Sequence, residues 1–365
     1  MVYLLLAAGI FMGWSLGTND AANAFGTAVA TNVIKYRTAV TIIAVFVVLG
    51  AFFMGYGNLE KTAELATMNE VMPSPGTVAD AVASGNTDSL VLKSALKAAI
   101  IFICGAVTVF VMSYLKFPVS ANQSIIGAVI GWGLFYADYS NPTLRSENLK
   151  QIGKFASTWL INPVGAAVIS FVIIFLANKF LIPRISKLAN YDKVIKIGYL
   201  FAGALASWSI GVNSAASVTA YYYDKDLDGV VTNLFSVDTF TGDFFTAGRI
   251  VATIGGLSIA FGVLTYSKKV MMTVGSSIVP LTQIEGFLVI IAMAMTILLM
   301  ENLMGIPVST SQAVVGAVIG AGLTKGVKQV NFGVFKNIAI AWISSPLAAG
   351  ILAYLIALAT QSYFG

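Results

Sequence analysis

The sequence predicts an all-α polytopic membrane protein, built from two inverted-topology repeats of about five membrane elements each. Three observations carry this prediction. Of the 365 residues, 58% are hydrophobic and only 10% are charged, whereas a soluble domain has about 25% charged residues. Apolar segments near the length of a membrane span recur along the chain. Polar motifs inside these segments occur once in each half.

The composition also excludes several classes of protein. The net charge of +5 comes from basic residues in short loops, which report orientation and do not indicate a nucleic-acid partner. Histidine is absent, which removes the commonest proton shuttle and transition-metal ligand. A membrane enzyme would need His, Cys or paired carboxylates at a cleft, and the single Cys104 lies in an apolar segment. We therefore expect neither enzyme activity nor a cofactor.

Ten apolar segments are expected to form the membrane elements, with the lipid bilayer around them. They lie near residues 2–30, 39–57, 93–116, 117–136, 155–178, 197–222, 248–266, 284–304, 307–324 and 337–361. The fourth and ninth are short, start at a proline and are rich in glycine, so they are candidates for broken or re-entrant helices. The N-terminus lacks a basic n-region, and we expect a first membrane segment there instead of a cleaved signal.

The loops predict how the chain is oriented in the plasma membrane. Four loops are rich in Lys and Arg, and basic loops stay in the cytoplasm. They are centred on Lys35, on residues 179–196, on Lys268 and on Lys325. The loops at 58–92 and 223–247 are acidic. Ten crossings with both termini outside place every one of these basic loops inside. The weakest fit is 137–154, predicted outside although it carries three basic residues.

The inverted topology is inferred from motifs that occur twice in the same order. WSLG at 14–17 returns as WSIG at 208–211, and Asn19 corresponds to Asn213. PVSANQSIIGAVIG at 118–131 returns as PVSTSQAVVGAVIG at 307–320, and Trp159 with Pro163 returns as Trp342 with Pro346. The expected parts are a first repeat at 1–178, a basic cytoplasmic linker at 179–196 and a second repeat at 197–365. Inverted repeats around interrupted helices are typical of secondary transporters.

A polar motif lies within the first segment of each repeat. Asn19, Asp20 and Asn23 correspond to Asn213, Ser214 and Ser217. A carboxylate at membrane depth needs an ion, water or polar partners. We expect Asp20 to bind Na⁺ or to carry H⁺, with the other five residues as further cation ligands. The alternative is that Asp20 only satisfies neighbouring helix ends. The glycines of this stretch permit either a break in the helix or a close backbone approach.

The two PVS stretches are the second candidate site. Proline suits the first helical turn, and Ser or Thr beside it can cap free N–H groups. Those N–H groups, at the positive end of a helix dipole, also form an anion site. Two such ends could converge on one tetrahedral oxyanion; alternatively, the hydroxyls only cap buried helix starts. The expected substrate contacts are Ser120, Asn122, Gln123, Ser309, Thr310, Ser311 and Gln312, together with Asn19 and Asn213. Because these motifs contain no Lys or Arg, a co-transported cation is the natural counter-charge.

These motifs resemble those of the inorganic phosphate transporter family of sodium- or proton-coupled symporters. GTNDAANAFGT at 17–27 and PVSTSQAVVGAVIGAG at 307–322 are similar to the motifs of that family, and the resemblance covers both halves. It implies that Asn19, Asp20, Asn213 and the Ser and Thr residues after the two prolines line the substrate and cation sites. The departures are Ser214 and Ser217, Ala121-Asn122, and the glutamines 123 and 312 where the family has histidine.

The departures leave phosphate and sulfate open as substrates. Phosphate keeps P–OH groups that donate best to a carboxylate, whereas sulfate only accepts hydrogen bonds and is penalised by an unpaired carboxylate. The retained Asp20 favours phosphate and the serine at 214 favours sulfate. We expect Na⁺-coupled phosphate symport, with a Na⁺- or H⁺-coupled sulfate permease as the alternative. An oxyanion channel is a poorer fit, because inverted repeats suit alternating access. The oligomeric state is left open, a homodimer included.

Overall fold

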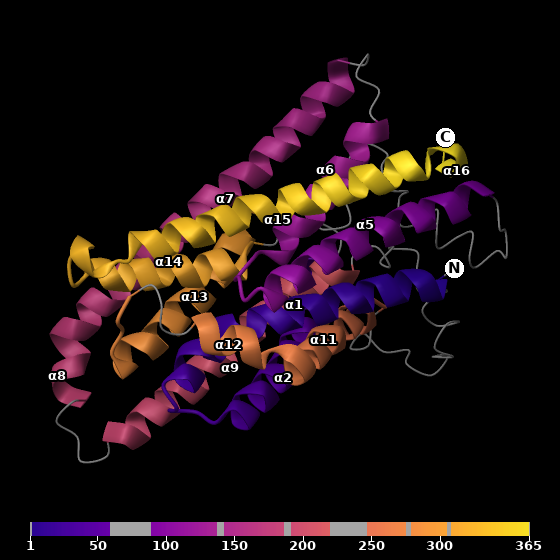
Figure 1. Ribbon diagram of the computed structural model, residues 1–365. Coiled ribbons are helices and arrows are strands. Elements are labelled where there is room, and N and C mark those ends of the chain that lie inside the picture. The colour runs from indigo at the N-terminus through magenta and orange to yellow at the C-terminus, as the bar shows by residue number, and fades with distance from the viewer. Residues whose placement is uncertain are drawn as a thin grey trace.

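The computed structural model describes residues 2–58, 89–136, 142–185, 191–219, 247–274, 279–304 and 308–364. Figure 1 shows this part of the chain as a bundle of helices. No strand occurs in the ranges just given. A helix satisfies its backbone N–H and C=O groups internally, which is what a chain surrounded by lipid requires.

Each of the ten predicted apolar segments contains one main helix. The first half holds α1 (Val2–Ala30), α2 (Tyr36–Phe53), α5 (Ser89–Tyr114), α6 (Ala121–Tyr136) and α7 (Pro142–Leu176). The second half holds α9 (Tyr191–Thr219), α11 (Ala247–Tyr266), α13 (Gln283–Met304), α14 (Thr310–Leu323) and α15 (Phe332–Ala359). Short turns complete the described part: η1 (Gly55–Asn58), η3 (Ala177–Leu181), α8 (Ile182–Ile185), α12 (Lys268–Val274), η5 (Val327–Gln329) and α16 (Gln361–Phe364).

Seven helices of the described part are long and apolar enough to cross a membrane, namely α2, α5, α7, α9, α11, α13 and α15. The 29 residues of α1 also exceed the roughly 20 that a span needs. By contrast, α6 has 16 residues and α14 has 14, which is short of a full span. The predicted all-α polytopic architecture is confirmed. Whether α6 and α14 re-enter the membrane stays a prediction, although their lengths agree with it.

Two predicted loops are partly helical. α7 begins at Pro142, inside the predicted loop 137–154, because proline suits the first helical turn and good helix formers follow it. The predicted linker 179–196 contains η3, α8 and the first turns of α9, which begins at Tyr191. The predicted segments were bounded by hydropathy, which indicates the part of a helix that can face lipid. The helix itself continues as long as its backbone hydrogen bonds do, so α7 and α9 extend beyond the apolar segments. The acidic loops lie almost wholly outside the described residues.

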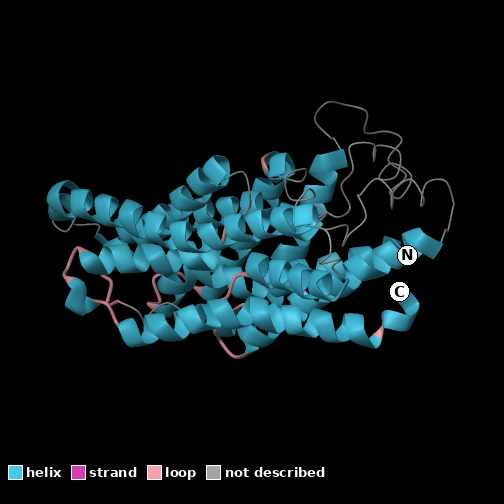
Figure 2. Cartoon of the chain, turned by 90° about the horizontal axis from the view of Figure 1, so that it is seen from above, coloured by secondary structure: helices cyan, strands magenta, loops and turns pink. Residues whose placement is uncertain are grey.

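Corresponding helices of the two halves pack in corresponding ways. α1 packs against α5 and α11, while α9 packs against α13 and α2. Likewise, α6 runs along α15 and α14 along α7. Figure 2 shows the helices side by side, with the N- and C-termini at the same end of the bundle. A chain that crosses the membrane an even number of times has both termini on the same side. The inverted orientation of the halves, and the side of the membrane that holds the termini, stay predictions.

Glycine brings α6 close to α15 and α14 close to α7. A Cβ on Gly127 would collide with the carbonyl of Pro346, and a Cβ on Gly316 would collide with the carbonyl of Pro163. The next glycine along each short helix meets its partner's backbone in the same way. Small residues let helix backbones approach closely, which drives packing where lipid removes the hydrophobic force between helices. The short helices are therefore held against α7 and α15 by backbone contact.

We expect Gly316→Ala to destabilise the protein, because the added Cβ would enter the space of the Pro163 carbonyl oxygen. Overpacking of this kind costs about 1–3 kcal/mol. Gly153→Ala is the matched control, since a Cβ there meets nothing within 4 Å. Thermal unfolding of the purified variants should show a lower Tm for Gly316→Ala only. Equal melting temperatures would contradict the packing described.

Candidate functional site

The two duplicated polar motifs lie within continuous helices. Asn19, Asp20 and Asn23 are on α1, and Asn213, Ser214 and Ser217 are on α9; each is at most 4% exposed. Neither helix breaks at its glycines. A Cβ on Gly17 would collide with the carbonyl of Ile259 on α11, and a Cβ on Gly211 would collide with that of Val47 on α2. The glycines thus serve close packing, the second of the two roles expected for them.

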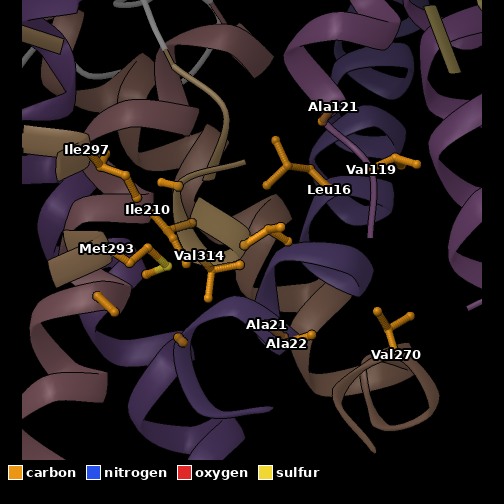
Figure 3. Packing of buried hydrophobic residues seen from close by; sticks show 14 of the residues in the cluster. Leu16, Ala21, Ala22, Val119, Ala121, Ile210, Val270, Met293, Ile297 and Val314 are labelled. Atoms are coloured by element: carbon orange, nitrogen blue, oxygen red, sulfur yellow. The ribbon is translucent and has the colours of Figure 1, made fainter. Parts of the chain in front are cut away.

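Apolar side chains surround these motifs. Figure 3 shows Leu16, Ala21 and Ala22 of α1 among the buried residues, together with Ile210 of α9 and Val314 of α14. Each of the five is 6% exposed or less. In such surroundings a polar group without a partner is costly, and a charge is costlier still. The partner of each polar atom therefore indicates what that atom does.

Asn19 braces the chain that enters α6. Its Nδ2 donates to the carbonyl oxygen of Phe117 at 3.0 Å and to Ser113 Oγ at 2.9 Å. Its Oδ1 accepts from the backbone N–H of Val119 at 3.3 Å. The backbone before a helix start cannot satisfy itself, and unpaired groups there would cost stability. The Asn19 amide supplies the missing partners.

Asn213 braces the chain that enters α14 in the same way. Its Nδ2 donates to the carbonyl oxygen of Val308 at 2.9 Å, and its Oδ1 accepts from the N–H of Val308 at 2.8 Å. The second hydrogen of Nδ2 goes to Ser214 Oγ at 3.3 Å. Val308 corresponds to Val119 in the duplicated PVS stretch, so the two amides hold equivalent backbone groups.

This bracing limits what the two amides can do for a ligand. A carboxamide has two N–H donors and two acceptor lone pairs. Both donors of Asn19 and both of Asn213 are used, which leaves one lone pair on each Oδ1. A lone pair can face a cation but cannot donate to an anion. These two residues can therefore offer a ligand an acceptor oxygen, for a cation or for a hydroxyl group, but no N–H donor.

Asp20 joins α1 to the first turn of α14. Thr310 Oγ1 donates to Asp20 Oδ2 at 2.8 Å, and Asn23 Nδ2 donates to Asp20 Oδ1 at 3.2 Å. Asn23 Nδ2 also lies 3.3 Å from Thr310 Oγ1 and 3.4 Å from Ser311 Oγ. These partners are neutral, so they do not balance the charge of an ionised carboxylate. Among the described residues, no three His, Cys, Asp or Glu side chains gather as metal ligands.

The first serine of each PVS stretch caps a helix. Ser309 Oγ accepts from the N–H of Gln312 at 3.2 Å, and Ser120 Oγ accepts from the N–H of Gln123 at 3.3 Å. This agrees with the simpler of the two roles expected for the hydroxyls. The first amides of a helix have no partner inside it and point outward. The starts of α6 and α14 therefore retain donors suited to an anion.

The two helix starts are tied to each other crosswise. Ser311 Oγ, on α14, donates to the carbonyl oxygen of Val119 at 2.7 Å. Asn122 Nδ2, on α6, donates to the carbonyl oxygen of Val308 at 3.2 Å. Each helix thus hydrogen-bonds the backbone that precedes the other. The two N-termini predicted to converge are adjacent in the structure.

Several buried oxygens of the predicted site have no hydrogen-bond partner. They are Asn23 Oδ1, Asn122 Oδ1, Gln123 Oε1, Ser217 Oγ and Gln312 Oε1. Gln123 and Gln312 also line an open groove of about 720 Å³ whose other walls are mainly apolar, with Trp159, Trp342 and the exposed Leu160 among them. Each unsatisfied buried group costs about 1–3 kcal/mol. Such a concentration of free oxygens is typical of a site that takes a ligand or water. No hydrogen bond joins Ser217 to the rest.

Two contributors were not predicted from the sequence. Asn162, on α7, donates through Nδ2 to the carbonyl oxygen of Ser309 at 2.7 Å, and Ser113, on α5, accepts from Asn19. Asn162 could have been found as an amide within an apolar segment, directly before Pro163. Ser113 offers no such signal, since a single serine in a membrane helix usually bonds its own backbone.

We expect Asn213→Ala to lower stability, because the N–H of Val308 loses its acceptor in a buried place. The expected cost is about 1–3 kcal/mol. Asn302→Ala is the matched control, since this exposed amide donates only to Leu298 in its own helix. Thermal unfolding should separate the two variants. An unchanged Tm for Asn213→Ala would show that the amide does not brace α14.

Comparison with known proteins gives the family. Residues 16–353 match the Phosphate transporter family. Proteins named "Putative phosphate permease" in Thermococcus kodakarensis and Pyrococcus furiosus are 29% and 28% identical to this chain. The first match covers 96% of this chain and 96% of the relative, and the second covers 100% and 97%.

A solved structure described as the sodium-dependent phosphate transporter has the same fold. Its TM-score is 0.69 at 22% sequence identity, over 99% of this chain and 100% of that one. The resemblance inferred from the motifs is thus confirmed. The match over most of its length shows that this multi-pass membrane protein belongs to the phosphate transporter family.

Proposed function

We propose that this protein carries inorganic phosphate across the plasma membrane together with Na⁺. The observation that carries the proposal is the contact between the buried carboxylate of Asp20 and Thr310, in the first turn of α14. It places an acidic group beside two adjacent helix N-termini. A site of this kind can hold an anion and a cation at once, as a symporter requires.

The adjacent starts of α6 and α14 provide for the anion. The crosswise bonds of Ser311 and Asn122 keep the two N-termini together. Each N-terminus carries the equivalent of about half a positive charge. Two of them, with their outward N–H groups, suit an oxyanion better than one does. The free oxygens of Gln123 and Gln312 can accept hydrogen bonds from the P–OH groups of phosphate, which sulfate lacks.

Asp20 provides for the cation. Na⁺ prefers hard oxygen ligands, as other hard cations do, and Asn23 Oδ1 is free beside the carboxylate. Asn19 and Asn213 each retain a lone pair that can face the cation, whereas the predicted ligands Ser214 and Ser217 belong to the motif without a carboxylate. A bound cation would also offset the anion in these low-dielectric surroundings. Transport would follow when the two halves, 1–178 and 197–365, move relative to each other about the site, with both termini outside the cell.

Uptake by reconstituted protein tests the substrate and the coupling. Radiolabelled phosphate and sulfate are offered separately to proteoliposomes, with and without an inward Na⁺ gradient. We expect the gradient to drive phosphate accumulation and to leave sulfate outside. Accumulation of sulfate with phosphate excluded would contradict the substrate. Phosphate uptake that follows a pH gradient and ignores Na⁺ would make H⁺ the coupling ion.

Asp20→Asn tests the central carboxylate. The variant keeps the shape of the side chain and an oxygen for Thr310 to donate to, so the fold should persist. We expect Na⁺-driven phosphate uptake to fall by about tenfold or more, which corresponds to about 1.4 kcal/mol of lost interaction. Asn302→Ala should retain uptake. Unimpaired uptake by Asp20→Asn would remove this residue from the site.

A further inference from the structure

The duplicated motifs define two corresponding half-sites; hydrogen bonds join the members of the first, and the second is defined by correspondence in the sequence, with Asn122 and Asn213 meeting at the Val308 carbonyl. The first half-site consists of Asp20 and Asn23 on α1 with Thr310 and Ser311 on α14. The second half-site consists of the corresponding residues Ser214 and Ser217 on α9 with Ala121 and Asn122 on α6. Their backbone ties match, because Ser311 donates to Val119 and Asn122 donates to Val308. The scaffold is thus repeated, and the side chains can be compared position by position.

The first half-site contains a carboxyl group, and hydrogen bonds connect its side chains. Asp20 accepts from Thr310 at 2.8 Å and from Asn23 at 3.2 Å, and Asn23 reaches Ser311 at 3.4 Å. One oxygen, Asn23 Oδ1, is left without a partner. A carboxylate with neutral neighbours and a free amide oxygen offers a cation both a balancing charge and a neutral oxygen ligand.

The second half-site is neutral and incomplete. Serine replaces the carboxylate at 214, and alanine replaces the threonine at 121. Ser214 Oγ accepts from Asn213, while Ser217 Oγ and Asn122 Oδ1 have no partner. Neutral oxygens can replace the water around an ion only when many of them converge, as in the filters of K⁺ channels. Among the described residues, Ser217 Oγ, Asn122 Oδ1 and the spare lone pair of Asn213 Oδ1 would have to compensate the desolvation of a full charge without a carboxylate.

We propose that one Na⁺, held at Asp20, accompanies each phosphate, and that the second half-site takes a hydrogen-bond donor in place of a cation. This rests on the proposed function and adds the number of ions carried. The donor is water or a P–OH group of the substrate, because Ser217 Oγ and Asn122 Oδ1 both accept. The absence of a carboxylate at 214 is what limits coupling to a single cation.

Two other acidic residues, Glu285 and Glu301, are buried on α13. Glu285 forms an ion pair with Lys325 at 2.6 Å and accepts from the N–H of Thr282 at the start of the helix. Glu301 is 4% exposed near the other end of α13. The test therefore includes the variant Glu301→Gln.

The test counts both ions in one preparation. Proteoliposomes with the purified protein take up ²²Na⁺ and ³²P-phosphate together, and the ratio of initial rates is corrected with protein-free vesicles. We expect one Na⁺ per phosphate for the wild type and for Glu301→Gln. Ser214→Asp restores the carboxylate of the second half-site and should raise the ratio towards two.

The outcomes separate this inference from the proposed function. A wild-type ratio of two overturns the single cation while leaving Na⁺-coupled phosphate transport intact. If Glu301→Gln then lowered the ratio to one, the second ion would be at Glu301. Phosphate uptake without ²²Na⁺ entry would overturn the coupling and this inference together. The wild-type ratio decides the question even if Ser214→Asp fails to fold.

Discussion

The structure depends on the hydrogen bonding of backbone that lies between helices at membrane depth. Two short helices, α6 and α14, begin inside the bundle, and the chain before each start has N–H and C=O groups that no helix satisfies. Asn19 and Asn213 supply the partners from the middle of α1 and α9. A carboxamide suits this role because it offers donors and an acceptor in one plane, as a backbone amide does. The position of both helix starts, and hence of the site, follows from these two amides.

The second constraint is distance between helices. Lipid does not drive apolar helices together, so contact has to come from close packing. Gly127 and Gly316 place the short helices directly against the backbones of α15 and α7. The outer faces of those long helices remain apolar and open, as at Leu160 and Leu347, which are 73% and 59% exposed. The polar motifs thus lie inside the bundle, among apolar core residues, while the outer faces of these helices are apolar, as expected when the surrounding solvent is lipid.

The chemistry of the site is less symmetric than its scaffold. Equivalent amides, caps and crosswise ties occur in both halves, yet only the first motif retains a carboxylate. A charge in a low-dielectric interior controls its surroundings more strongly than any neutral group does. One substitution between the halves can therefore change which ions the site takes while the backbone stays the same. The two halves therefore share their backbone contacts, and they differ in the charge that their polar motifs can carry.

The sequence by itself determined the membrane class, the ten helical segments and the family, and it predicted the two related halves and most of the polar residues that meet at the candidate site. It could do so because hydropathy and duplication are properties of the linear chain. Only the tertiary structure decided what each polar atom contacts. Asn19 and Asn213, expected as substrate and cation contacts, also brace the backbone before α6 and α14, while Ser113 and Asn162 contact this region without having been predicted. An amide or hydroxyl has many acceptable partners, and which of them it meets depends on helices that are far apart in the sequence.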